Sequence, residues 1–186
     1  MVLRLRGGFP AIKFNSMNEP IIIKFGTDAP KWRMINIGLN LEGVCKNKNF
    51  EAYRQKVWIP KGFGKFYITK EVYDSKCPIC PKVCEDVENM GLYMARCISK
   101  GRIKGESEEK RMESEHRQKD GFLTFEDKDE TRVEWLYLEM EVVPVWCDWW
   151  LQLYFLIAFY QISSENKITQ TIYLLKNRPL YKDIVQ

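Results

Sequence analysis

Alternating apolar and polar residues run through the first half of the chain, and this alternation predicts β-strands. The clearest run spans 32–41 (WRMINIGLNL), and a shorter β-branched run spans 21–25. A third strand is expected at 53–59, with 63–72 returning as the second arm of a hairpin and Gly64 at a bend or bulge. The pattern predicts a mainly β fold with irregular loops, in which zinc-ribbon-like knuckles would fit.

The strand pattern continues in the second half of the chain, but a stretch of charged residues interrupts it. Strands are expected at 90–98 and 133–143, and the charge-rich stretch 100–120 separates them. That stretch has almost no apolar residue, so two interpretations stay open: a solvated helix with spaced ion pairs, or a mobile loop in a long hairpin. The lone histidine, His116, lies in this stretch and is expected to be an exposed side chain in a polar loop.

The chain changes character after residue 144. Its 186 residues suffice for one self-stabilising domain, which we expect at 9–144, preceded by a short segment, 1–8. Residues 145–186 are first apolar and then polar. Three interpretations of them stay open: translated non-coding sequence outside an evolved fold, a soluble strand or core helix, and a membrane helix. The membrane helix is the least favoured, because a span needs about 20 predominantly apolar residues and Asp148 and Gln152 interrupt this run.

Charge and cysteine content limit the class of protein. The chain has 29 basic and 25 acidic residues and a net charge of +4, so it lacks the strong basic field of a ribosomal or DNA-coating protein. We expect no signal peptide, because the first 14 residues contain no long apolar run. Six cysteines without such a signal indicate a reducing compartment, the cytoplasm or the nucleus.

The cysteines give the strongest chemical signal. In Cys77-Pro-Ile-Cys80 two thiols are separated by two residues, a spacing that lets a tight turn aim both at one tetrahedral zinc ion. Cys45, in the turn after an expected strand, is the natural third ligand. Cys84 is the expected fourth ligand, with Cys97 and His116 as alternatives. An incomplete site, in which the thiols are buried packing groups, is the competing interpretation. Four side-chain ligands would leave no position for water, so the zinc is expected to be structural.

Several enzyme and finger classes do not fit the residues present. A cross-braced ubiquitin-ligase finger needs eight zinc ligands, whereas the chain has six cysteines and one histidine. A cysteine protease needs a thiolate beside an oriented histidine, and His116 has no visible orienting partner. Gly62-Phe-Gly64 is too short for a phosphate-binding loop. We therefore expect a protein that is not an enzyme and has no small-molecule substrate.

Binding of single-stranded nucleic acid is an alternative function. Aromatic side chains flanked by lysines suit single strands, because bases stack on the rings while the lysines contact phosphates. Such residues cluster in the third expected strand and the segment after it: Lys56, Trp58, Lys61, Lys65, Phe66 and Tyr67. The competing interpretation is a hairpin with ordinary lysine-protected edges.

The first eight residues, MVLRLRGG, resemble the C-terminal tail of ubiquitin and differ from it only at the first position. The paired glycines, Gly7 and Gly8, leave the backbone free to thread a narrow protease channel. In ubiquitin fusions, deubiquitinating proteases cut after the second glycine and release the extension that follows. The resemblance implies that Phe9 begins such an extension, and that these proteases are partners of an intact relative. Because the compact ubiquitin body is not in the chain, we expect a truncated fusion.

The resemblance extends to 38–80 and 123–135, which are similar to poorly characterised cysteine-containing extensions fused to ubiquitin in some fungi and protists. In that pattern a cysteine is expected where Phe50 stands. The resemblance implies a non-enzymatic extension domain, and with the cysteines it favours a zinc-stabilised protein-interaction module with an unknown protein partner. A degenerate gene product without function is a further alternative.

Overall fold

The computed structural model describes residues 10–145, and these confirm the predicted mainly β fold. Within this range, ten strands form two antiparallel sheets of five strands each. One helix, α1 (Ile68–Asp74), and two 3-10 turns, Lys31–Arg33 and Asp129–Thr131, are the helical elements described.

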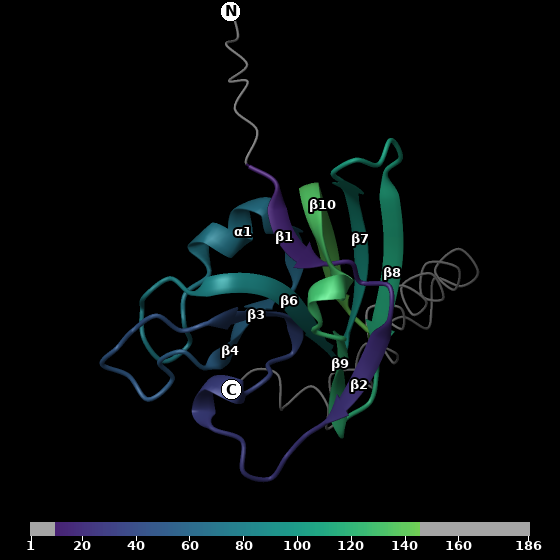
Figure 1. Cartoon of the computed structure of the whole chain (residues 1–186). Coiled ribbons are helices and arrows are strands. Elements are labelled where there is room, and N and C mark those ends of the chain that lie inside the picture. The colour runs from purple at the N-terminus through teal and green to yellow at the C-terminus, as the bar shows by residue number, and fades with distance from the viewer. Residues whose placement is uncertain (1–9, 146–186) are drawn as a thin grey trace, which may run out of the picture. The chain divides into compact units, whose positions relative to one another are not determined.

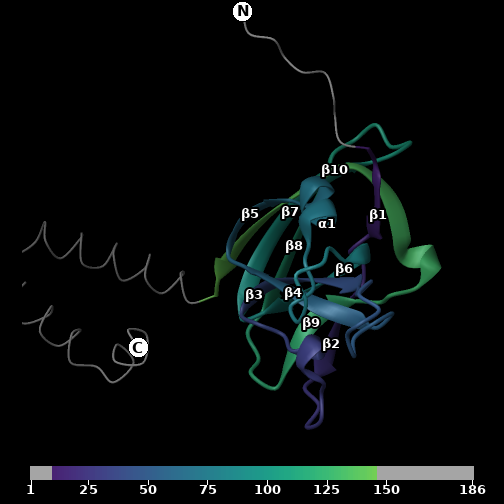
Figure 2. The same ribbon diagram turned by 90° about the vertical axis from the view of Figure 1, so that its left-hand side faces the viewer.

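The first sheet is built around the long strand β10 (Arg132–Pro144). Strand β7 (Ala95–Ile103) pairs with one edge of β10, and β8 (Lys110–His116) pairs with β7. The other edge of β10 pairs first with β1 (Ile12–Asn15) and then with β5 (Gly64–Tyr67). Helix α1 continues directly from β5 and packs beside β10 (Figure 2).

The second sheet holds the strands that carry the candidate site. In spatial order they are β2 (Pro20–Lys24), β9 (Gly121–Phe125), β6 (Glu85–Tyr93), β3 (Gly38–Val44) and β4 (Lys56–Gly62). Strands β3, β4 and β6 run across the direction of β7, β8 and β10 (Figure 1). The sheets therefore pack with crossed strands, and side chains from both fill one shared core.

The largest fully buried side chain of the core is that of Trp135 in β10. Its indole N–H donates to the Asn15 carbonyl at 3.3 Å, so the ring joins β10 to the end of β1. The register of β10 against β7 shifts between Trp135 and Tyr137, which marks a bulge. Gly101 of β7 accommodates the ring, because a Cβ there would lie 2.8 Å from it and 2.5 Å from the Tyr137 carbonyl oxygen.

Two of the predicted strands are confirmed and two have different boundaries. The runs at 21–25 and 133–143 correspond to β2 and β10. The strand predicted at 32–41 is wrong in its first half: β3 begins only at Gly38, and Arg33 instead bonds to Glu42 at 2.6 Å. The strand predicted at 90–98 is two strands, because the chain turns at Met94, whose φ is +50°.

The hairpin predicted at 53–59 and 63–72 is also wrong. Strand β4 is present, but the chain then leaves its sheet and enters the other one as β5. Gly62 and Gly64 permit this change of direction because both have positive φ, +77° and +137°. The end of the expected second arm is helix α1.

The charge-rich stretch 100–120 forms no helix, and much of it is strand rather than loop. It completes β7 and forms β8, in which half-exposed and exposed side chains alternate until the buried His116. The predicted exposure of His116 is thus wrong, since only 2% of it is exposed. Its Nδ1 accepts the Met94 N–H at 3.4 Å, and burial lowers the pKa of the imidazole.

Candidate metal centre

The strand register of the second sheet brings two distant cysteines to one end of the sheet. Strands β3 and β6 are antiparallel neighbours, and Val44, the last residue of β3, is paired with Glu85, the first residue of β6. Cys45 follows β3 and Cys84 precedes β6. The two cysteines therefore lie at the same end of the sheet, although 39 positions separate them in the sequence.

The Cys77-Pro-Ile-Cys80 sequence forms the tip of a small hairpin between α1 and β6. Lys76 and Val83 form an antiparallel bridge, and the Cys77 N–H donates to the Lys82 carbonyl at 3.0 Å. The hairpin is anchored below the tip by Ser75. That residue is fully buried, and its carbonyl accepts the Cys84 N–H at 2.8 Å.

Three cysteine sulfurs converge where this hairpin meets the end of β3. The Sγ atoms of Cys45, Cys77 and Cys80 all lie within 4.8 Å of one another, and each residue is at most 5% exposed. The Cys45 and Cys80 sulfurs are 3.7 Å apart. Two thiolates bound tetrahedrally to one zinc at about 2.3 Å would be about 3.8 Å apart. The spacing of this pair therefore fits a shared tetrahedral metal ion.

Cys84 lies beside this group without belonging to it. Its sulfur is close enough to interact with Cys45, Cys77 and Cys80, but it does not meet the 4.8 Å distance with all three. Gly43 gives it room, because a Cβ at that position would lie only 3.2 Å from the Cys84 Cβ. Of the candidates for a fourth ligand, Cys84 is the one that adjoins the cluster.

The other two candidates for a fourth ligand are in the other sheet. Cys97 is buried in β7 with its sulfur 3.5 Å from the Ser99 hydroxyl, and burial raises the pKa of its thiol to about 11. His116 is on the neighbouring strand β8, where it bonds to the backbone of Met94. Phe50, in the loop after Cys45, is 38% exposed.

Burial and hydrogen bonds shift the pKa values of the thiols in and beside the cluster. Burial raises the pKa of Cys45 to about 11 and that of Cys84 to about 12. Burial acts in the same direction on Cys80, but hydrogen bonds from the Lys82 backbone and the Asn47 side chain outweigh it and lower the pKa of that thiol. The thiolate form is therefore favoured at Cys80 relative to Cys45 and Cys84, and a bound cation would favour it at those two as well.

Asn47 is a part of the site that sequence reasoning missed. It is only 6% exposed, its backbone hydrogen-bonds to Cys45, and its side chain bonds to Cys80. Hydrogen bonds of this kind orient metal ligands. The only sequence signal was its position two residues after a cysteine, in a turn-forming stretch of Asn and Lys.

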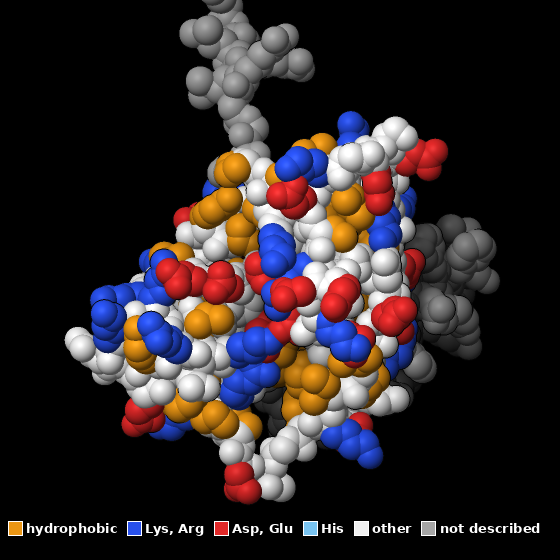
Figure 3. Space-filling model, viewed as in Figure 1, with side chains coloured by type: hydrophobic (Ala, Val, Ile, Leu, Met, Phe, Trp, Pro, Cys, Tyr) orange, Lys and Arg blue, Asp and Glu red, His pale blue; other side chains and the backbone are white. Residues whose placement is uncertain are grey.

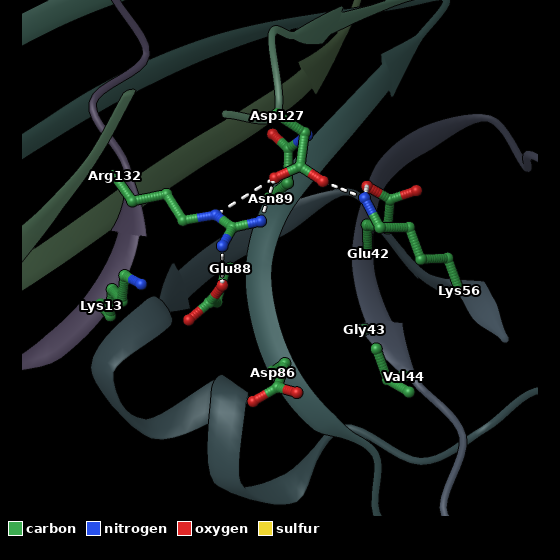
Figure 4. Close-up of a pocket in the computed structure, with 10 residues that line it drawn as sticks. All are labelled: Lys13, Glu42, Gly43, Val44, Lys56, Asp86, Glu88, Asn89, Asp127 and Arg132. Atoms are coloured by element: carbon green, nitrogen blue, oxygen red, sulfur yellow. Dashed lines mark hydrogen bonds and ion pairs between the residues drawn. The ribbon is translucent and has the colours of Figure 1, made fainter. Parts of the chain in front are cut away.

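A second polar site is a surface cavity of about 330 Å³ that is lined by ion-paired side chains (Figure 4). Asp127 bonds to Arg132 at 2.5 Å and also pairs with Lys56, while Arg132 pairs with Glu88 at 2.9 Å. Burial raises the pKa of Asp127, but the bonds from Lys56 and Arg132 outweigh it and hold that pKa below its usual range. The basic and acidic side chains in this network balance each other's charge. The pair of Arg132 and Glu88 also links β10 of the first sheet to β6 of the second.

The residues considered for nucleic-acid binding do not form one exposed face. Trp58 is 2% exposed, with the Arg33 guanidinium 5.0 Å above its ring. The lysines of β4 are paired with acids, Lys56 with Asp127 and Lys61 with Glu71 at 2.6 Å. The remaining residues are on β5, in the other sheet: Lys65, which pairs with Glu141 at 3.7 Å, half-buried Phe66, and Tyr67.

Some sequence predictions concern residues outside the described range. Gly7 and Gly8 lie there, as does nearly all of the segment 145–186. None of the helices in residues 10–145 has the length and apolar character needed to cross a bilayer.

Comparison with known proteins identifies no relative. The chain matches no protein-family model, no curated protein and no solved structure. The ubiquitin-fusion resemblance therefore stays a prediction, and the case for function depends on the geometry of the cysteine cluster.

Proposed function

We propose that the protein binds one structural zinc ion through Cys45, Cys77, Cys80 and Cys84, and that the domain is a non-enzymatic protein-interaction module. The convergence of three buried sulfurs from the end of β3 and the hairpin tip carries this proposal. Cys84 is the proposed fourth ligand, because it directly precedes β6 at the end of the sheet where Cys45 follows β3.

The donor set supports zinc and a structural role. Buried thiolates in a tetrahedral arrangement select soft or borderline metals, and zinc is the commonest of these in closed four-ligand sites. A redox pair at Cys77 and Cys80 fits less well, since reactive cysteines are partly exposed, whereas these two are 5% and 1% exposed.

The position of the cluster suggests what the metal would stabilise. The loop 46–55 and the hairpin 76–83 contain no long strand or helix. The loop follows Cys45 directly, and the hairpin carries Cys77 and Cys80. A metal ion shared between them would fix both loops to the ends of β3 and β6. Loops held on a rigid scaffold are the usual carriers of binding function.

Metal content of the purified full-length protein tests the proposal. We expect one zinc per chain by elemental analysis, because four cysteine ligands fill one tetrahedral zinc site. Cys45→Ser and Cys80→Ser should lose the zinc, and Cys84→Ser should bind it more weakly. Cys97→Ser is the matched control, since Cys97 is equally buried but lies in the other sheet, and it should retain the metal. A wild-type protein that takes up no zinc would refute the proposal.

A further inference from the structure

Strand β2 leaves one edge of the second sheet unpaired. It lies at the end of the strand order, and within the part of the chain that the structure describes it pairs only with β9. Phe25 continues the register of this pair, since its N–H donates to the Asp120 carbonyl at 3.0 Å. Alternate residues of an antiparallel strand bond to the same neighbour. Ile21 and Ile23 therefore face β9, and the N–H and carbonyl groups of Ile22 point to the free edge.

The centre of this edge is apolar on both faces of the sheet. Ile21, Ile22 and Ile23 are consecutive, so their side chains alternate between the two faces, and they are 40%, 49% and 41% exposed. Figure 3 shows apolar side chains gathered in the region of β2, in the lower part of the molecule. Exposed apolar strands with free backbone groups are sites at which another strand can pair.

The other edges of the two sheets carry features that prevent such pairing. Charged side chains and prolines on an edge strand obstruct the addition of a further strand. Such residues occur in the interior of each of the other edge strands: Arg111, Glu113 and Glu115 in β8, Lys13 in β1, Lys65 in β5, and Pro60 and Lys61 in β4. In β2 the proline and the lysine are confined to the two ends, Pro20 and Lys24. Among the edge strands that the structure describes, β2 alone has an interior without charge or proline.

We propose that β2 pairs with β2 of a second copy of the chain, antiparallel and about a two-fold axis at Ile22. In this register Ile22 lies opposite its own copy and Ile21 lies opposite Ile23, so apolar side chains meet on both faces. Each Ile22 N–H would donate to the other copy's Ile22 carbonyl, and each Lys24 N–H to the other copy's Pro20 carbonyl. This is the two-fold register in which the whole of β2 overlaps.

The ends of β2 favour a second copy as the occupant of the edge. Glu19 immediately precedes the strand and Lys24 ends it. Antiparallel pairing brings the lysine end of each copy to the glutamate end of the other, so opposite charges meet at both ends. Pro20, which has no N–H, lies opposite Lys24, so the missing hydrogen bond falls at the rim of the interface. The pairing uses neither the cysteines nor the loops beside them, so it does not depend on the proposed zinc site.

Sedimentation equilibrium of the full-length protein tests this inference. Because each copy contributes one short strand, we expect a weak, reversible dimer. The average mass should rise from that of one chain toward that of two as the concentration increases through the micromolar range. A mass that stays at one chain would overturn the inference and leave the edge to a strand of another protein or to none. A mass that grows beyond two chains would overturn it as well, since a two-fold pairing of edges closes at the dimer.

Charge at position 22 tests the two-fold axis itself. Ile22→Lys and Ile22→Glu should each raise the dissociation constant of the dimer about tenfold or more, because like charges then meet at the axis and the contact between the two isoleucines is lost. An equal mixture of the two variants should recover the dimer, since a lysine then faces a glutamate.

Ile37→Lys is the matched control for these variants. Ile37 is 46% exposed and lies outside β2, so its replacement should leave the dimer unchanged. A mixture of the two Ile22 variants that stays monomeric would contradict the proposed register. A control that dissociates as far as the Ile22 variants would contradict the assignment of the interface to β2.

Discussion

Removing the zinc should lower the thermal unfolding midpoint of the protein by roughly 8–16 °C. A ligand present at 1,000 times its dissociation constant stabilises the folded state by about 4.1 kcal/mol. In domains of about 150–250 residues each kcal/mol shifts the midpoint by roughly 2–4 °C. The loss should be large because the metal would be the main link between the loop after β3 and the hairpin before β6.

Calorimetry with and without a chelator measures this shift. Zinc should restore the midpoint of the chelated protein, and magnesium should not, because magnesium prefers oxygen ligands. Cys80→Ser provides the matched control: it should start from the lower midpoint, and a chelator should not change it further. A wild-type midpoint that is indifferent to the chelator would show that the cysteines are packing groups.

Replacement of Trp135 should destabilise the domain by about 3–5 kcal/mol, the range for truncating a large buried aromatic residue to alanine. The side chain is fully buried, and its ring lies directly against Gly101. Trp135→Ala would leave a cavity between the sheets and remove the indole N–H that bonds to the Asn15 carbonyl. The nearby backbone has little freedom to collapse into the cavity because β10 is paired along both edges.

Urea denaturation measures the free energy of unfolding of this variant. Leu136→Ala is a close control, because Leu136 is the next residue on the same strand but is 44% exposed at the bulge. It should change the stability by no more than about 0.5 kcal/mol. Equal effects of the two substitutions would contradict the burial of Trp135 in the core.

The alternation of residues was sufficient to predict the β class but not the assignment of strands to sheets. Strands β2 and β10 follow directly from β-branched and aromatic runs. The change of sheet after β4 depends on the positive φ of Gly62 and Gly64, and a glycine in the sequence does not reveal the sign of its φ. Strand β8 escaped prediction because nearly all its residues are polar, so no apolar face marks it; pairing with β7 holds it in place.

The grouping of Cys45, Cys77 and Cys80 was predictable from the sequence, but its surroundings were not. The spacing of Cys77 and Cys80 indicated a metal half-site, and Cys45 was the expected third ligand. Their convergence depends on the pairing of β3 with β6, which no local spacing reveals. The same pairing favours Cys84, the fourth ligand expected from the sequence, over the alternatives Cys97 and His116.

X-ray absorption at the zinc edge of the zinc-loaded, full-length protein tests the central claim most directly. The spectrum reports the type, number and distance of the atoms around the metal in solution. We predict four sulfur ligands at about 2.3 Å and no oxygen or nitrogen in the first shell. A first shell made mainly of oxygen or nitrogen, or one with fewer than three sulfurs, would contradict a zinc site built from these cysteines.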